Sequence, residues 1–368
     1  MSHLLCVCAA TSALATVLSA QVLTLPPSYD TKEGDSLALM AGITKRSVTQ
    51  LIISSHLLLP VSGKSIDGVW LRRDPNTAEI LEAGSSRLSV KVSETLVSPE
   101  GLSTAFASNH GPAPMTVFDG LISAPASPSV VQLLWAPEHT VRIPFQSPIA
   151  YGGSNLCIEF ASSNTLGCSS KWPVDAASES HDGSVSLLGN HCSGFWAPNL
   201  STLVGDSGSL AVGCTARFTG FGRHMTAGFL LVGTLLPMGG ADLTFLGMTG
   251  CRLMVQSQAA IACRFDTRWS GAPLDMPGAA NFVIPIPFNP ALLGGSFASQ
   301  LVNLETGSQQ SNPAGITLSA ALLATLATSA STLGMAMVDG APTDLASPLP
   351  SEGVVITNRA PVLRLTYR

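Results

Sequence analysis

Charged side chains are scarce in this chain of 368 residues. Asp, Glu, Lys and Arg make up 11% of the residues, against about 25% in a typical soluble domain. The net charge is only −5, and no run of Lys or Arg occurs anywhere. Affinity for nucleic acid rests mainly on clustered basic side chains, so this composition excludes a nucleic-acid partner. Few groups are available for acid–base chemistry, which favours a non-enzymatic protein without cofactor or metal.

Long amphipathic helices are also lacking. Gly (34) and Pro (25) interrupt the apolar runs at short intervals, a texture typical of many short strands joined by turns. Residues 87–93, 139–145 and 362–367 alternate apolar and polar side chains with period two, as half-buried strands do. Residues 130–135 and 156–160 are rich in β-branched and apolar residues and are also expected to be strands.

The segment 282–288 predicts an edge strand. Pro285 and Pro287 lie two residues apart, so their missing N–H groups fall on the same side of the strand, which can then pair on one side only. Residues 289–294 predict a short helical turn, with Asn289 as N-cap, Pro290 in the first position and Gly294 at its end.

The first twenty residues predict a secretory signal peptide. An apolar stretch without Asp, Glu, Lys or Arg is followed by small residues up to Ala20, the pattern that precedes signal cleavage. A buried N-terminal strand or helix is the alternative. We therefore expect a secreted or cell-surface protein.

Cleavage after Ala20 would leave six of the eight cysteines, an even number that favours disulfides in an exported chain. The loop-closure entropy favours sequential pairing, although sequence alone leaves fifteen connectivities open. The spacing matches no zinc motif. The expected pairs are Cys157–Cys168, Cys192–Cys214 and Cys251–Cys263.

Two other segments have alternative interpretations. Residues 315–338 carry no charge and are long enough for a membrane helix, but their many Ala, Ser and Thr residues favour a pair of small-residue strands, and no membrane span is expected. The basic pairs Lys45-Arg46 and Arg72-Arg73 are expected to lie at solvated strand ends.

The stretch 205–209 (GDSGS) resembles the nucleophile segment of trypsin-like serine proteases. Ser209 replaces the final glycine of that motif, and no histidine stands in the context that supplies the general base. We favour a Gly/Asp/Ser turn and keep a secreted hydrolase using Ser207 as an alternative.

Two further clusters are candidates for binding. A loop near Cys192 contains two imidazoles and three carboxylates, but a disulfide-stapled surface loop is favoured over a metal site. These residues are Asp175, Glu179, His181, Asp182 and His191. Trp172 and Trp196 lie in a Gly/Ser-rich region, where exposed indoles could stack on sugar rings. Structural packing is the favoured interpretation.

Several segments resemble uncharacterised families of secreted proteins from planctomycete bacteria. In the first half, residues 25–34 (LPPSYDTKEG), 104–112 (TAFASNHGP) and 117–120 (VFDG) are similar to them; in the second, 284–294 (IPIPFNPALLG), 297–300 (FASQ) and 312–317 (NPAGIT). The resemblance implies an exported all-β protein and transfers no catalytic residue. It implies a jelly-roll-like domain followed by an immunoglobulin-like module.

The sequence thus predicts an all-β protein of two β-sandwich domains. A signal peptide over residues 1–20 precedes a domain over 21–220, a second domain over 221–324 and a tail over 325–368. The terminal strand of this tail returns to the first domain or adds to the second. The expected function is a structural or adhesive role at the cell surface, with surface polysaccharide or other surface proteins as partners. A carbohydrate-binding protein is the first alternative, and a serine hydrolase is the second.

Overall fold

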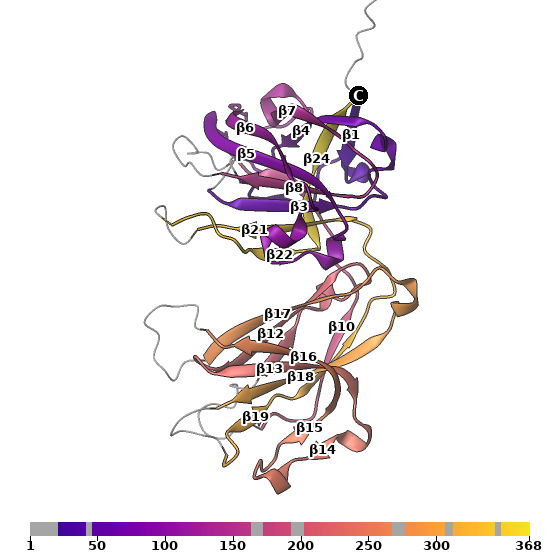
Figure 1. The fold of residues 1–368 in the computed structure, drawn as a ribbon, viewed down its shortest axis with the longest axis vertical. Helices are drawn as coiled ribbons and strands as arrows, with labels where there is room; N and C mark the ends of the chain where they lie inside the picture. Colours follow the sequence, from indigo (N-terminus) through magenta and orange to yellow (C-terminus); the bar gives the residue numbers. More distant parts are fainter. Residues whose placement is uncertain are drawn as a thin grey trace, which may run out of the picture.

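The computed structural model describes residues 21–41, 46–162, 172–192, 202–266, 277–305, 312–342 and 347–368. Across these residues the protein is all-β, with antiparallel sheets and a sandwich-like arrangement. The helices in these ranges are short 3-10 turns, and none is long and apolar enough to cross a membrane. The sheets form two groups, which lie one above the other in Figure 1.

The first group contains three sheets. The six-stranded sheet has the order β22-β21-β3-β8-β5-β6, the four-stranded sheet β1-β24-β4-β7, and the three-stranded sheet β2-β9-β23. Their bounds are β1 Gln21–Leu25, β2 Ser36–Ala38, β3 Val48–Ile53, β4 Ser65–Arg72, β5 Gly84–Thr95, β6 Met115–Ala124, β7 Thr140–Ala150, β8 Asn155–Ala161, β9 Val174–Ser178, β21 Met335–Gly340, β22 Val354–Ile356, β23 Arg359–Pro361 and β24 Leu363–Tyr367.

The second group also contains three sheets. The order β10-β20-β18-β13-β16, with β19 beside β18, forms one sheet; β11-β12-β17 and β14-β15 form the others. Their bounds are β10 Ser184–Leu188, β11 Thr202–Gly205, β12 Thr215–Arg223, β13 Ala227–Leu235, β14 Ala241–Asp242, β15 Arg252–Leu253, β16 Val255–Arg264, β17 Pro277–Pro285, β18 Ser296–Leu304, β19 Ile316–Leu318 and β20 Ala321–Thr325.

Nine 3-10 turns lie among the described residues. They are η1 Pro27–Tyr29, η2 Leu59–Val61, η3 Pro99–Gly101, η4 Phe106–Asn109, η5 Pro137–His139, η6 Ser207–Ser209, η7 Pro237–Gly239, η8 Thr244–Leu246 and η9 Pro290–Leu292.

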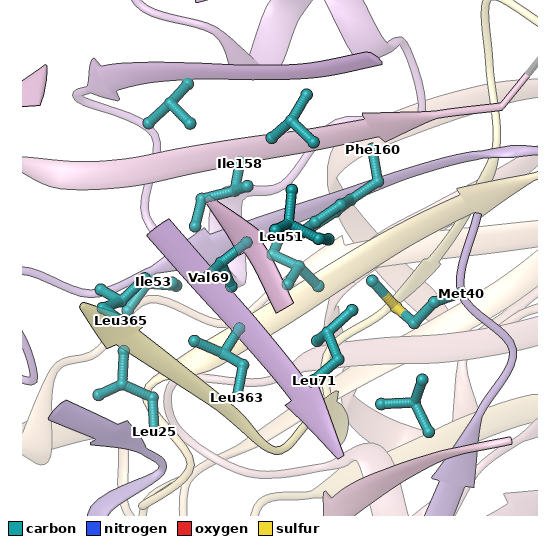
Figure 2. Packing of buried hydrophobic residues seen from close by; sticks show 14 of the residues in the cluster. Leu25, Met40, Leu51, Ile53, Val69, Leu71, Ile158, Phe160, Leu363 and Leu365 are labelled. Atoms are coloured by element: carbon teal, nitrogen blue, oxygen red, sulfur yellow. The ribbon is translucent and has the colours of Figure 1, made fainter. Parts of the chain in front are cut away.

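The main core of the first group lies between its six-stranded and four-stranded sheets. Figure 2 shows side chains of β3 and β8 clustered with those of β4 and β24. The six-stranded sheet is covered on its other face as well, where Ile52 and Cys157 pack against Phe106 of η4. Because successive residues of a strand point to opposite faces, β3 is buried along its whole length.

The second group has a separate core, which lies between the sheet β11-β12-β17 and its own sheet β10-β20-β18-β13-β16. Gly220 and Gly222 of β12 face this interior, where a Cβ at Gly220 would lie 2.9 Å from Leu301 and one at Gly222 would lie 2.7 Å from Phe265. The absence of side chains at these two positions therefore leaves room for Leu301 of β18 and for Phe265, which follows β16.

Most expected strands are confirmed. Residues 87–93, 139–145, 156–160 and 362–367 fall largely in β5, β7, β8 and β24, and 315–338 contributes β19, β20 and part of β21. β17 lies at one end of its sheet, and the Asn289 side chain caps η9 by accepting from Ala291 N at 3.0 Å.

Two local expectations are wrong. Residues 130–135 form bends and turns, with Val130 and Leu133 mostly exposed. β-branched composition was not sufficient there because the segment pairs with no neighbouring strand. Arg72 and Arg73 are completely buried rather than solvated. Each guanidinium donates to backbone carbonyls, which replace the water that it loses on burial.

The expected boundary near residue 220 does not separate the two groups. Residue 220 lies inside β12, which pairs with β17 along its entire length. The chain instead crosses to the second group through residues 179–183, between β9 and β10, and returns through residues 326–334, between β20 and β21. The tail belongs to the first group, where β24 lies between β1 and β4.

Candidate functional site

A buried polar network on the outer face of the six-stranded sheet is the first candidate site. Strand register places Gln50 of β3 and Lys91 of β5 directly opposite Glu159 of β8. Gln50 donates to Glu159 Oε2 at 2.7 Å and Lys91 donates to Oε1 at 3.1 Å. His110 Nε2 lies 3.2 Å from Glu159 Oε2. The carboxylate is therefore held by groups from two neighbouring strands and one loop.

Glu159 is ionised in this setting. Burial alone would raise the pKa of its carboxyl, but the hydrogen bonds from His110, Lys91 and Gln50 and the charge of Lys91 outweigh burial and lower the pKa to about 2.

Ser93 and His110 extend this network toward a cleft. The Ser93 hydroxyl lies 2.8 Å from His110 Nδ1, so that Ser93, His110 and Glu159 form a continuous chain. With His110 Nε2–H donating to Glu159, Nδ1 accepts from the Ser93 hydroxyl, which is the connectivity of a serine-hydrolase triad with the two ring nitrogens exchanged. Ser93 also borders an open cleft of about 630 Å³ lined by Pro112, Met115 and Ile149.

The same residues anchor the loop that covers the sheet. Gly111 N donates to Ser93 Oγ at 3.2 Å, Gln50 donates to Phe106 O at 3.0 Å, and Asn109 donates to Gln50 at 2.9 Å. Satisfied polar networks of this kind fix a segment to a sheet. The network therefore serves a structural purpose whether or not Ser93 reacts.

The sequence contains a signal for this network that the sequence prediction missed. Gln50 and Glu159 are polar residues within otherwise apolar strands, and both are buried. Buried polar side chains require partners, so these positions mark a network even before the register is known.

A second cluster lies where the chain crosses between the two groups of sheets. Glu179 and His181 follow β9, and Cys214 precedes β12. Their donor atoms lie within 4.8 Å of one another. The sequence prediction considered Glu179 and His181 but placed them with Asp182 and His191. Cys214, distant in sequence, is the third member of the cluster.

Asp175 belongs to a different interaction. Its carboxylate forms an ion pair with Arg72 at 2.6 Å, and both side chains are completely buried. Arg72 also donates to the carbonyls of Tyr29 and Lys32, and Asp175 accepts from Gly34 N at 3.0 Å. The pair thus ties the segment after β1 to β4 and β9.

Ser207 is exposed in η6, at the start of a capped turn. The Asp206 side chain accepts from Gly208 N at 3.1 Å, and Ser209 donates to Asp206 O at 2.7 Å. Among the described residues no histidine forms a hydrogen bond with the Ser207 hydroxyl. The backbone N–H of His181 donates to Gly208 O, next to Ser207, at 3.4 Å.

Trp172 packs in the interior, which is the favoured interpretation, and the alternative of an exposed indole does not hold for it. Its side chain is completely buried in the main core, and its Nε1–H donates to Pro125 O at 3.1 Å. The ring is needed to fill space between sheets, which the flanking Gly/Ser-rich sequence could not reveal. Trp196 lies outside the described residues.

The expected cysteine pairing is also wrong. Cys192 is bonded to Cys251, and Cys157, Cys214 and Cys263 have free thiols; Cys168 lies outside the described residues. Closing a loop two to three times longer than Cys192–Cys214 costs only about 1 kcal/mol more, so packing of the second group decides the pairing. Burial raises the pKa of each free thiol, to about 12 for Cys214 and about 11 for Cys263.

No protein-family model matches the chain, and no curated protein or solved structure matches it significantly.

Proposed function

We propose that this chain is an exported, non-enzymatic protein with a structural or adhesive role at the cell surface. The apolar segment over residues 1–20 and the low content of charge support export. In this proposal the first group of sheets is a jelly-roll-like domain and the second an immunoglobulin-like one, as in the secreted planctomycete proteins that the sequence resembles.

One observation carries the proposal: the buried charged groups serve as internal cross-links. Arg72 and Asp175 join β4 to β9, Arg73 holds the carbonyls of Thr77, Glu79 and Pro128, and Glu159 fixes the loop that carries His110. Because its few buried charged side chains stabilise the fold, the chain is suited to persist outside the cell rather than to catalyse a reaction.

The proposed partners are surface polysaccharide or other surface proteins. β17 lies at the end of its sheet and exposes Asn281 and Val283. An open strand edge can add a strand from a second protein. Proline has no backbone N–H, so an added strand could bond only to the other backbone N–H and C=O groups of this edge.

Localisation and adhesion test the proposal together. We expect the mature protein to be recovered from the cell surface or medium with Gln21 as its first residue. Cells lacking it should adhere less to surfaces or to one another, and the purified protein should restore adhesion. Recovery only from the cell interior with residues 1–20 intact, or unchanged adhesion without the protein, would refute this role.

Serine hydrolysis is a second candidate, because Ser93, His110 and Glu159 are connected beside a cleft. A fluorophosphonate probe distinguishes it from the structural role. Labelling of the folded protein that is lost in Ser93→Ala but kept in Ser207→Ala would indicate a nucleophile at Ser93. The reverse pattern would indicate Ser207. Absence of labelling would leave the network with its structural role alone.

Carbohydrate binding now depends on Trp196, since Trp172 is buried. A glycan array with the wild type and Trp196→Ala tests it. Binding that is lost in the variant would support this function, and absence of binding by the wild type would reject it.

A further inference from the structure

The two chain crossings between the groups of sheets meet at the carboxylate of Glu179. This residue lies at the start of the first crossing. Its Oε2 accepts from the backbone N–H groups of Thr332 (3.0 Å) and Leu333 (3.3 Å) in the second crossing. The Ser331 hydroxyl donates to the other oxygen, Oε1. The carboxylate is thus fixed in position by the segment that it faces.

Two further atoms that can bind a metal ion lie close to this oxygen, Oε1 of Glu179. It lies 3.7 Å from Cys214 Sγ and 3.5 Å from His181 Nε2. Zinc binds sulfur at about 2.3 Å, and nitrogen and oxygen at about 2.0–2.2 Å, in tetrahedral geometry, so two ligand atoms on one zinc ion stand about 3.3–3.6 Å apart. The two distances to Oε1 are close to that spacing.

The imidazole supplies a second, independent observation. The His181 side chain is only 6% exposed, and its buried Nε2 atom forms no hydrogen bond. Leaving a buried polar nitrogen unpaired is costly, and such atoms often mark a site for a missing ion or water. A ligand nitrogen of His181 lies within 4.8 Å of both a Glu179 carboxylate oxygen and the Cys214 sulfur.

The charges of the cluster also suit a divalent cation. A bound divalent cation stabilises the Cys214 thiolate directly. One carboxylate and one thiolate then balance the two positive charges, which removes the cost of burying an unpaired charge.

We propose that Glu179, His181 and Cys214 bind a zinc ion that joins the first chain crossing to the segment preceding β12. A thiolate, an imidazole and a carboxylate suit zinc better than calcium or magnesium, which prefer oxygen ligands alone. Three protein ligands leave one position for water or for a group from a partner. Ser331 is a positioning residue that orients the Glu179 carboxylate. This inference is independent of the proposed role at the cell surface.

Metal titration of the purified mature protein tests the site. After treatment with a chelator, we expect one zinc ion to bind per chain and about one proton to be released near neutral pH, from Cys214. Cobalt(II) in place of zinc should give intense visible bands and a sulfur-to-metal charge-transfer band. Ser331→Ala should weaken binding by about 10-fold or more.

Variants separate this site from adventitious binding. Cys214→Ser should abolish the charge-transfer band, and His181→Gln should weaken zinc binding more than Ser331→Ala does. Cys263→Ser removes another free thiol and serves as the matched control, with unchanged binding expected. Circular dichroism of each variant checks that it is folded.

Measurements on the wild type alone can refute the proposal, so the test does not depend on whether a variant folds. Failure to bind zinc stoichiometrically, or binding without proton release or a sulfur-to-cobalt band, would reject the site. Equal binding by the wild type and folded Cys214→Ser would mean that only adventitious metal is bound.

Discussion

The buried ion pair between Arg72 and Asp175 offers the sharpest test of how this fold is held together. Arg72 Nη2 lies 2.6 Å from Asp175 Oδ2, and neither side chain has any exposed surface. Burial raises the pKa of Asp175 and lowers that of Arg72, so each charge loses hydration on folding. The pair is therefore expected to stabilise the fold less than its short distance implies, whereas removal of one partner leaves an uncompensated charge.

The substitution Asp175→Asn removes one charge with little change in shape. Breaking a buried pair in this way costs about 3–5 kcal/mol. For a unit the size of the first group of sheets, this corresponds to a fall in Tm of roughly 6–20 °C, at about 2–4 °C per kcal/mol. Urea and thermal unfolding followed by far-ultraviolet circular dichroism measure both quantities.

The chain supplies a matched control in the exposed pair Arg87–Asp119. Its charged atoms are 3.0 Å apart, but its side chains are 55% and 51% exposed. Asp119→Asn should cost less than about 1 kcal/mol. The double variant Arg72→Met/Asp175→Leu should recover part of the stability lost in Asp175→Asn. Two apolar side chains leave no charge unpaired, but Gly34 N and the carbonyls of Tyr29 and Lys32 lose their partners. The reasoning is refuted if Asp175→Asn costs no more than Asp119→Asn.

Three further predictions concern the disulfide, the acid limb of stability and the buried indole. Replacing Cys251 with Ala should destabilise the second group by about 2–4 kcal/mol, since the disulfide to Cys192 closes a 59-residue separation; urea unfolding measures this loss, and a wild type insensitive to reductant would contradict it. Glu159 should contribute stability above its unfolded pKa, near 4.3, and lose it as the pH falls toward the folded pKa of about 2. Glu159→Gln should therefore flatten the acid limb of stability against pH, and an unchanged limb would argue against the network. Trp172→Phe should lower the free energy of unfolding by about 1–3 kcal/mol, because Pro125 O loses its donor; no loss would mean that this hydrogen bond contributes nothing.

Local patterns were sufficient where one segment decides its own conformation. The alternation in residues 87–93 predicted β5. The prolines of 282–288 predicted an edge strand, and β17 does lie at the end of its sheet, although it ends at Pro285 and leaves Pro287 outside. Asn289 and Pro290 predicted the turn η9. In each case the physical cause lies within a few neighbouring residues: side-chain period, missing donors or a capping oxygen.

Long-range partners could not be predicted in this way. The sequential rule for disulfides failed at Cys192 because loop entropy changes too slowly with length to oppose packing. The carboxylate of Glu159 meets Gln50 and Lys91 only through strand register, and Glu179 meets Cys214 only where the first chain crossing packs against the segment preceding β12.

By itself, the sequence determined the all-β class and the positions of many strands, because hydrophobic period and Gly/Pro punctuation act locally. The tertiary structure alone decided that the C-terminal strands complete the first group of sheets, that Trp172 and Arg72 are buried, and that Glu179, His181 and Cys214 converge. These outcomes depend on which distant surfaces pack together, and the free energy of that packing is shared among residues far apart along the chain.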